Sequence, residues 1–203
     1  MSRDFLEWLL FRYTYLVHSY KVEGIILKRT NFGEADRFLT VFTKEKGKIS
    51  VLAKGIRRIT SRRAGSVELF NQAILFLHKG RNFDILTEAT TLNTFPHFRL
   101  DFQKVGAAYY ACELIDRLTP EEQEHDAVYE LLVKFLTWLE GQPNNSKVTL
   151  ALSRFDKRLL TDLGYWSTRM DGQVDLKNFI KELIGGEVRS EKFLAMGLQK
   201  LSS

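Results

Sequence analysis

Basic side chains gather in one short stretch of the sequence, residues 44–63, which holds eight Lys and Arg against one acid, Glu45. Guanidinium groups bind phosphate with paired hydrogen bonds and also stack on bases, so a cluster rich in Arg favours nucleic acid. A solvated charged face is the alternative for such a stretch. We expect one continuous groove along it. The residues expected to contact DNA are Arg37, Lys44, Lys46, Lys48, Lys54, Arg57, Arg58, Arg62 and Arg63.

Six phenylalanines are interleaved with these charges, and an aromatic ring at the surface can stack on a base. A Phe within a strand is more often in the core, so about one in four of the six is expected at the surface. The six residues are Phe32, Phe38, Phe42, Phe70, Phe76 and Phe83.

Other residue types give little support for catalysis or metal binding. Glu34 and Asp36 are expected to form salt bridges with Arg37 within a turn, rather than a metal site or a catalytic pair. The four histidines are far apart in the sequence, and it contains no phosphate-binding loop, zinc-protease helix or nucleophile elbow. We therefore expect no enzymatic activity, no metal and no cofactor.

The single cysteine, Cys112, excludes an internal disulfide and suits a reducing compartment, so the expected location is the cytoplasm. Cys112 lies on an apolar helical stripe and is expected to be buried as a small hydrophobic residue.

Charge is distributed unevenly along the 203 residues. Residues 20–80 carry 13 Lys and Arg and 5 Asp and Glu, whereas the whole chain has a net charge of only +5. A basic part joined to a mildly acidic part indicates a polyanion on the first and another partner, such as a protein, on the second. An acidic membrane surface is the competing polyanion.

The first seventeen residues predict a short amphipathic helix, because Phe5, Leu6, Trp8, Leu9 and Phe11 recur at loose helical spacing. Charged residues interrupt this segment before an uncharged span can form. We therefore expect neither a signal peptide nor a membrane span, and no membrane partner.

From Val22 onward the apolar residues follow the period of a strand. Gly33, Gly47 and Gly80 lie between the apolar runs, where tight reversals would require positive φ. Five short strands favour a small barrel or sandwich, and the OB-fold is the five-stranded barrel that binds oligonucleotides. The expected strands cover residues 22–27, 38–43, 49–53, 66–77 and 83–90.

After Pro96 the period changes to that of a helix. One apolar stripe runs from Val105 to Leu118, and a second, for which Pro120 resembles the start, runs from Val128 to Gly141. Further helices are expected at residues 147–163, ending at Gly164, at 175–184, and at 191–201 with Ser190 as the N-cap.

Between Lys21 and Ala89 the sequence contains a series of specific motifs. They are Gly24-Ile25-Ile26-Leu27, Phe32-Gly33-Glu34-Ala35-Asp36-Arg37, Gly47-Lys48, Ala53-Lys54-Gly55-Ile56-Arg57-Arg58, Ser61-Arg62-Arg63 and Glu68-Leu69-Phe70. In these motifs and their order the chain resembles the bacterial RecO family of recombination mediators. The helical part resembles the family more weakly, at Phe155, Leu159-Leu160 and Leu163-Gly164-Tyr165.

The resemblance implies an α+β protein, with an N-terminal five-stranded OB-fold β-barrel followed by an all-helical C-terminal domain. Residues 1–19 would then form an N-terminal extension with the pattern of a short helix, residues 20–92 the OB-fold domain that binds nucleic acid, and residues 93–203 the helical domain. Many family members carry a four-cysteine zinc module after a Leu-Gly-Tyr segment. Residues 165–172 contain no cysteine, so a zinc site is expected to be absent.

The resemblance also implies binding and annealing of single-stranded DNA in recombinational DNA repair, without catalysis, in the cytoplasm at the nucleoid. Double-stranded DNA is a further candidate ligand. Such proteins act with the RecR protein and with the acidic C-terminal tail of single-strand-binding protein. Arg154 and Arg158, beside Phe155, are the expected contacts for this tail, and a packed Phe with two solvated arginines is the alternative.

Two other classes of function remain open at this point. The protein would be an interaction scaffold if its barrel and helical domain bound acidic peptides and had no role with nucleic acid. It would be a metal-dependent nuclease if it held a carboxylate cluster, but the spacing of its acidic residues does not suggest one.

Overall fold

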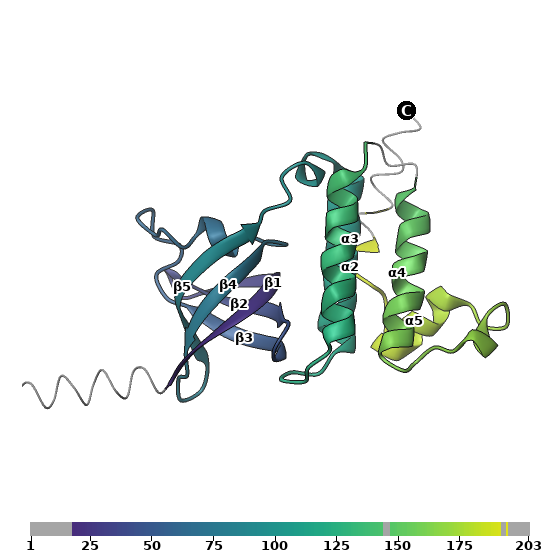
Figure 1. The fold of residues 1–203 in the computed structure, drawn as a ribbon, viewed down its shortest axis with the longest axis horizontal. Coiled ribbons are helices and arrows are strands. Elements are labelled where there is room, and N and C mark those ends of the chain that lie inside the picture. Colours follow the sequence, from purple (N-terminus) through teal and green to yellow (C-terminus); the bar gives the residue numbers. More distant parts are fainter. Residues whose placement is uncertain (1–17, 144–146, 192–193, 195–203) are drawn as a thin grey trace, which may run out of the picture.

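Five strands form a closed barrel, as the sequence predicts. The structure is a computed structural model that describes residues 18–143, 147–191 and 194. Around the barrel the strands follow the order β1-β2-β3-β5-β4, and neighbouring strands are antiparallel except for β3 and β5. This OB-type barrel lies at one end of the molecule and the helices at the other (Figure 1). The strands are β1 (Ser19–Phe32), β2 (Asp36–Thr43), β3 (Gly47–Ala53), β4 (Gln72–His78) and β5 (Asp84–Asn93).

Aliphatic side chains at alternate strand positions fill the barrel. On β2, Leu39 and Val41 are fully buried in it, and Thr40 between them is only half-buried. This alternation is the period of two that β-branched and aliphatic residues favour in a half-buried strand. A register shift between Ile26 and Lys28 marks a bulge in β1. The buried interior consists of Val22, Ile26, Leu39, Val41, Ile49, Val51, Ala53, Ile56, Val67, Ala73, Leu75, Leu77 and Leu86.

Two details of the strand prediction are wrong. The predicted fourth strand begins too early, because residues 65–67 form a 3-10 turn and the side-chain amide of Asn71 donates to the carbonyl of Gly65. Gly33 and Gly47 have the expected positive φ, but Gly80 does not. Gly80 is needed for space instead, since a Cβ there would lie 2.2 Å from the carbonyl oxygen of Phe83.

Four complete α-helices follow the barrel in the part of the chain that the structure describes. Asp101 caps the first by accepting hydrogen bonds from Gln103 and Lys104, and Gly185 ends the last in the left-handed region. The prediction of a helix start at Pro120 is wrong, because residues 119–125 form a loop. The predictions for residues 1–17 and for most of 191–201 lie outside the described residues. The helices are α2 (Phe102–Leu118), α3 (Asp126–Gly141), α4 (Val148–Asp162) and α5 (Leu176–Ile184).

One apolar core joins the barrel to the helices. Ile25, Leu27 and Phe42 of the barrel belong to the same buried cluster as the inner faces of α2, α3 and α4, which also contains Cys112. The ring of Phe42 lies 6.5 Å from that of Tyr129 on α3. Burial of a large apolar side chain contributes about 2 kcal/mol. The helices therefore cover one end of the outer face of β1 and β2.

The loop between α2 and α3 adds to the edge of β3. The N–H of Glu122 donates to the carbonyl of Lys48 at 2.8 Å, and Glu121 forms a parallel bridge with Lys48. Strand β5 pairs with β3 only further along, so the loop satisfies backbone groups that β5 does not reach. Gly47 allows this close approach, because a Cβ there would lie 1.7 Å from the carbonyl oxygen of Gln123.

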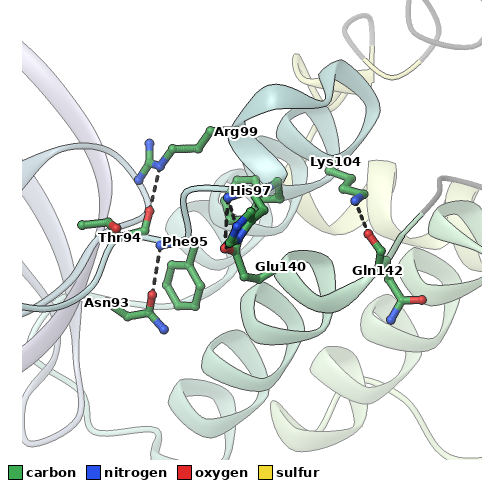
Figure 2. A network of polar contacts seen from close by, with 9 residues as sticks. Asn93, Thr94, Phe95, His97, Arg99, Lys104, Glu140 and Gln142 are labelled. Carbon is green, nitrogen blue, oxygen red and sulfur yellow. Dashed lines mark hydrogen bonds and ion pairs between the residues drawn. The ribbon is translucent and has the colours of Figure 1, made fainter.

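The segment between β5 and α2 is held against α3 by a polar network (Figure 2). The carboxylate of Glu140 accepts hydrogen bonds from the N–H groups of His97 and Phe98, each at 3.0 Å. Lys104 on α2 donates to the carbonyl of Gln142 at the end of α3. These contacts fix the direction in which the chain leaves the barrel and enters the helices.

A carboxyl group is buried inside the helical part. Asp156 on α4 is 4% exposed, and its Oδ2 accepts a hydrogen bond from the hydroxyl of Tyr110 at 3.1 Å. Its Oδ1 has no hydrogen-bond partner among the described residues. Burial raises the pKa of Asp156 to about 7, and the hydrogen bond from Tyr110 only partly offsets this.

Replacement of Gly47 by Ala should destabilise the protein more than replacement of Gly33 by Ala. Both glycines have positive φ, 63° and 56°, but a Cβ at Gly33 would have no atom within 4 Å. We expect a loss of about 1 kcal/mol for Gly33→Ala and about 3 kcal/mol or more for Gly47→Ala, measured by urea unfolding. Equal losses would show that the loop can leave β3 without cost.

Replacement of Asp156 by Asn should flatten the dependence of stability on pH. The pKa is raised to about 7 in the folded state, so the folded protein holds a proton that the unfolded chain releases near pH 4. The stabilising contribution is complete below about pH 4 and is lost as the pH rises through about 7, for a total of about 4 kcal/mol.

The measurement for Asp156 is urea unfolding of both proteins at pH 5 and pH 8. The natural protein should lose more stability than Asp156→Asn between these two values, because every other titrating group is shared. Equal losses in the two proteins would contradict the assignment.

Candidate nucleic-acid interface

The basic stretch of residues 44–63 is divided between the two ends of β3. Lys44 and Lys46 lie in the turn that precedes β3, at the end of the barrel covered by the helices. Residues 54–63, which we call the arginine loop, follow β3 at its other end. Seven strand residues separate the two groups, or about 20 Å. The nine predicted DNA contacts therefore do not line one continuous groove.

Lys48 is the clearest correction among the predicted DNA contacts. It is only 8% exposed, its ammonium group donates to the carbonyl of Asp116 on α2, and it lies 3.5 Å from the carboxylate of the same residue. A buried and paired ammonium group is not available to phosphate. Lys44 and Lys46 are exposed, and Lys46 Nζ lies 4.1 Å from the centre of the Tyr20 ring.

Two arginines hold the arginine loop in place. Arg63 donates to the carbonyls of Lys54, at 2.8 Å, and Leu86, at 2.6 Å, which ties the loop to β5. Arg57 donates to the carbonyl of Gly33 in the turn between β1 and β2. These guanidinium groups are thus partly used by the fold itself.

The other basic side chains of the arginine loop face solvent. Lys54, Arg58 and Arg62 are exposed, and together with Arg63 they line an open depression of about 570 Å³. Asp36 also lines it. Three exposed cations around one hollow provide a surface that can bind phosphate.

The turn between β1 and β2 differs from its prediction. The carboxylate of Asp36 accepts a hydrogen bond from the N–H of Gly55 at 2.7 Å, and Arg37 donates to the side-chain oxygen of Asn31 at 3.0 Å. In the described structure neither Asp36 nor Glu34 forms an ion pair with Arg37, so the expected salt bridges are wrong. The Asp36 contact instead joins this turn to the arginine loop.

Three phenylalanines form a row across the outer face of the barrel, which we call the aromatic row. The Phe38 ring on β2 lies 4.9 Å from the Phe32 ring at the end of β1 and 4.9 Å from the Phe83 ring just before β5. Phe32 and Phe83 are 50% and 48% exposed. Leu52 on β3 is opposite Phe38 in the strand register. The row therefore exposes two aromatic rings, Phe32 and Phe83, on either side of the half-buried ring of Phe38.

The expectation that about one in four of the six phenylalanines is exposed is wrong. Phe32, Phe76 and Phe83 are exposed, and only Phe42 and Phe70 are buried. Strand parity would have identified Phe38 as outward-facing, because Leu39 next to it fills the barrel. Phe32 and Phe83 also lie next to turns, and this position is a second indication that their side chains are exposed.

The aromatic row occupies the place where OB-folds bind oligonucleotides, which is the face of strands 2 and 3 between the loops joining strands 1 and 2 and strands 4 and 5. Phe32 leads into the first of these loops, and Phe83 ends the second. The second loop also carries Lys79 and Arg81, both exposed, which the sequence analysis did not select. The arginine loop is attached to the first loop through Arg57.

Comparison with known families agrees with this geometry. Residues 17–95 match the family model described as recombination protein O N terminal, and residues 99–166 match recombination protein O C terminal. The chain belongs to the RecO family. The barrel with the aromatic row is the part that matches the N-terminal RecO model.

Relatives in the RecO family differ from this chain in length. It is 40% identical to a DNA repair protein RecO from Roseiflexus sp. (strain RS-1), over 72% of this chain and 50% of that protein. It is 37% identical to a DNA repair protein RecO from Symbiobacterium thermophilum, over 72% of this chain and 57% of that protein. The chain thus spans about half the length of the curated RecO relatives that it matches.

The C-terminal RecO match includes α3 and α4, and these helices enclose a groove of about 670 Å³. Phe155 is buried at its base and packs with its ring 4.7 Å from that of Phe135. Arg154 and Arg158 are exposed at its edge, although Arg158 also pairs with Asp162 at 2.9 Å. The structure thus brings the three predicted contacts together on one groove. It is lined by Leu131, Lys134, Phe135, Trp138, Gln142, Lys147, Leu150, Ala151, Arg154, Phe155 and Arg158.

Residues 165–172, which contain no cysteine, are held by contacts with Asp171. The indole N–H of Trp166 and the ammonium group of Lys157 donate to Asp171 at 2.9 and 2.6 Å. Within residues 18–143, 147–191 and 194, no three His, Cys, Asp or Glu side chains are arranged to hold a metal ion. His18 and His78 are distant in sequence, but their ring centres lie 6.2 Å apart.

None of the described helices combines the length and the apolar composition needed to cross a bilayer.

Proposed function

We propose that this protein binds single-stranded DNA across the outer face of β2 and β3 and anneals complementary strands in recombinational DNA repair. The observation that carries the proposal is the aromatic row beside the arginine loop. Exposed rings next to guanidinium groups combine the two interactions on which single-strand binding depends, base stacking and phosphate neutralisation. The names of the curated relatives, DNA repair protein RecO, support the same role.

In the proposed complex the bases stack on Phe32, Phe38 and Phe83, and the backbone follows the exposed cations Lys54 and Arg58. Each phosphate that is neutralised releases counterions, and a strand with fewer free charges repels its complement less. Reduced repulsion allows the two strands to anneal. The base pairs form between the strands themselves, without a chemical step by the protein. Double-stranded DNA is a weaker ligand, because its paired bases cannot stack on the row. The proposed place of action is the nucleoid in the cytoplasm.

The groove between α3 and α4 is the proposed site for the acidic tail of single-strand-binding protein. An apolar base formed by Phe155 and Trp138 suits the aromatic end of such a tail, and Arg154 at the edge suits its carboxylates. Arg154 has no ion-pair or hydrogen-bond partner among the described residues, so it is available to a ligand. A RecR-type protein is the second proposed partner, as the family resemblance suggests.

Substitutions in the aromatic row and in the arginine loop should weaken binding in different ways. Phe32→Ala with Phe83→Ala should lower the affinity for a poly-dT oligonucleotide at least tenfold without changing the salt dependence, because each lost stacking contact is worth about 1–3 kcal/mol. Ala at Lys54, Arg58 and Arg62 should flatten the slope of log K against log salt by about 0.7 for each lost phosphate contact. Fluorescence anisotropy at several salt concentrations measures both.

The matched control removes three exposed cations from the helical part, by Ala substitution at Arg169, Lys177 and Arg189. If this control flattened the slope as much as the arginine-loop variant, binding would reflect overall charge and not a site. Binding of acidic peptide together with an absence of DNA binding by the natural protein would favour the scaffold function instead.

Arg154→Ala should weaken binding of a fluorescent acidic peptide with an aromatic C-terminus about tenfold or more, since a hydrogen bond between charged groups contributes about 1.5–3 kcal/mol. Binding of poly-dT should stay the same. Arg169→Ala is the matched control, because it removes an arginine that does not line the groove. The proposal fails if Arg154→Ala binds the peptide as well as the control does.

A further inference from the structure

A run of acids lies on the same face of the barrel as the proposed DNA site. Residues 121–126, which cover the end of the loop between α2 and α3 and the first residue of α3, contain Glu121, Glu122, Glu124 and Asp126 and no Lys or Arg, and all four acids are exposed. We call this segment the acidic loop. The basic barrel therefore presents a strongly negative segment next to its proposed ligand.

The acidic loop reaches the outer face of β3 itself. Glu121 Oε1 accepts a hydrogen bond from the hydroxyl of Ser50 at 3.2 Å. Ser50 pairs with Thr40, and the next outward pair along the strands is Leu52 with Phe38, which belongs to the aromatic row. Two strand residues correspond to about 7 Å. The carboxylate of Glu121 is thus held one outward-facing residue pair away from Phe38 of the aromatic row.

Two lysines at this end of the barrel, Lys46 and Lys48, already make contacts within the protein. Lys48 is paired with Asp116 under α2. Lys46 Nζ lies over the Tyr20 ring. The pKa of Tyr20 is raised, mainly by burial and by the hydrogen bond to Asp84, and to a smaller extent by the charge of Glu122. Lys48 therefore meets a carboxylate before it can meet a ligand, whereas Lys44 and Lys46 remain exposed.

Packing does not account for the charge of this loop. Its attachment to β3 uses backbone groups, namely the hydrogen bond from Glu122 N–H to the Lys48 carbonyl and the close approach of Gln123 to Gly47, and one acidic side chain, that of Glu121, which accepts the hydrogen bond from Ser50. The backbone contacts are possible with almost any side chain. The side chains of Glu122 and Glu124 are exposed and take no part in this attachment. A phosphate backbone on the neighbouring row is the nearest charged ligand that the site is proposed to take.

We propose that the acidic loop sets the path of single-stranded DNA, by excluding phosphates from the end of the β2–β3 face near the helices and so confining the strand to the aromatic row and the arginine loop. This inference rests on the proposed function. Like charges within about 10 Å repel strongly at low salt and weakly at high salt. The strand is then oriented with its backbone toward Arg58 and Arg62 and away from Glu121.

The test is a set of Gln substitutions at Glu121, Glu122 and Glu124. Gln is isosteric and still accepts the hydrogen bond from Ser50, so the loop keeps its contacts. The charge-matched control carries Gln at Glu130, Glu182 and Glu187 on the helical part. Affinity for poly-dT should rise about three- to tenfold over this control at about 20 mM salt and less than twofold at about 200 mM.

A double-mutant cycle then tests the path itself. Ala at Lys44 and Lys46 should change poly-dT affinity in the natural protein no more than Ala at Arg169 and Lys177 does. In the background of the three loop Gln substitutions, the same two Ala substitutions should remove most of the gain, because the strand now reaches these lysines.

The outcomes separate this inference from the function on which it rests. If the natural protein binds poly-dT and the loop variant binds no tighter than its charge-matched control, the acidic loop does not set the path. The same conclusion follows if Lys44 and Lys46 already contribute in the natural protein as strongly as in the loop variant. If neither the natural protein nor the loop variant binds, the proposed DNA-binding function fails together with the inference.

Discussion

The rest of the structure depends on the apolar end of the barrel's outer face. Ile25, Leu27 and Phe42 point out of the barrel, and they remain in water unless the helices cover them. Covering them places α2 and α3 at one end of β1 and β2 and leaves the other end open. The division of this face into a covered and an exposed half thus follows from the hydrophobic effect, and the aromatic row lies in the exposed half.

The covered end also determines what surrounds the ligand site. With α2 and α3 docked there, the loop between them has to pass the edge of β3, and Gly47 lets its backbone approach closely. Glu121 in that loop then lies beside Ser50, on the face that leads to Phe38. The same packing buries Lys48 against Asp116, which removes one cation from the surface. The position of the acidic loop and the burial of Lys48 therefore both follow from the docking of α2 and α3 on the barrel.

Much of the fold follows from sequence patterns, and the exceptions have identifiable reasons. The period of two, the turns at Gly33 and Gly47, and the helical stripes depend on local preferences, so the barrel and its helices can be predicted. The burial of Lys48 and the loop after Pro120 depend on contacts with elements distant in the sequence. The prediction of a positive φ at Gly80 was wrong for a similar reason. Gly80 is required because the carbonyl of Phe83 lies close to it, and a turn motif in the sequence does not reveal this contact.

The site was only partly predictable, because one residue type serves two purposes in it. Arg63 and Arg57 use their guanidinium groups to attach the arginine loop to β5 and to the first turn, whereas Arg58 and Arg62 in the same loop remain exposed. Sequence alone cannot separate them, since the difference lies in which carbonyls are within reach. The arrangement suits the proposed binding and annealing of DNA strands. A loop fixed by its own arginines needs no ligand to order it, so it can bind and release a strand at little entropic cost.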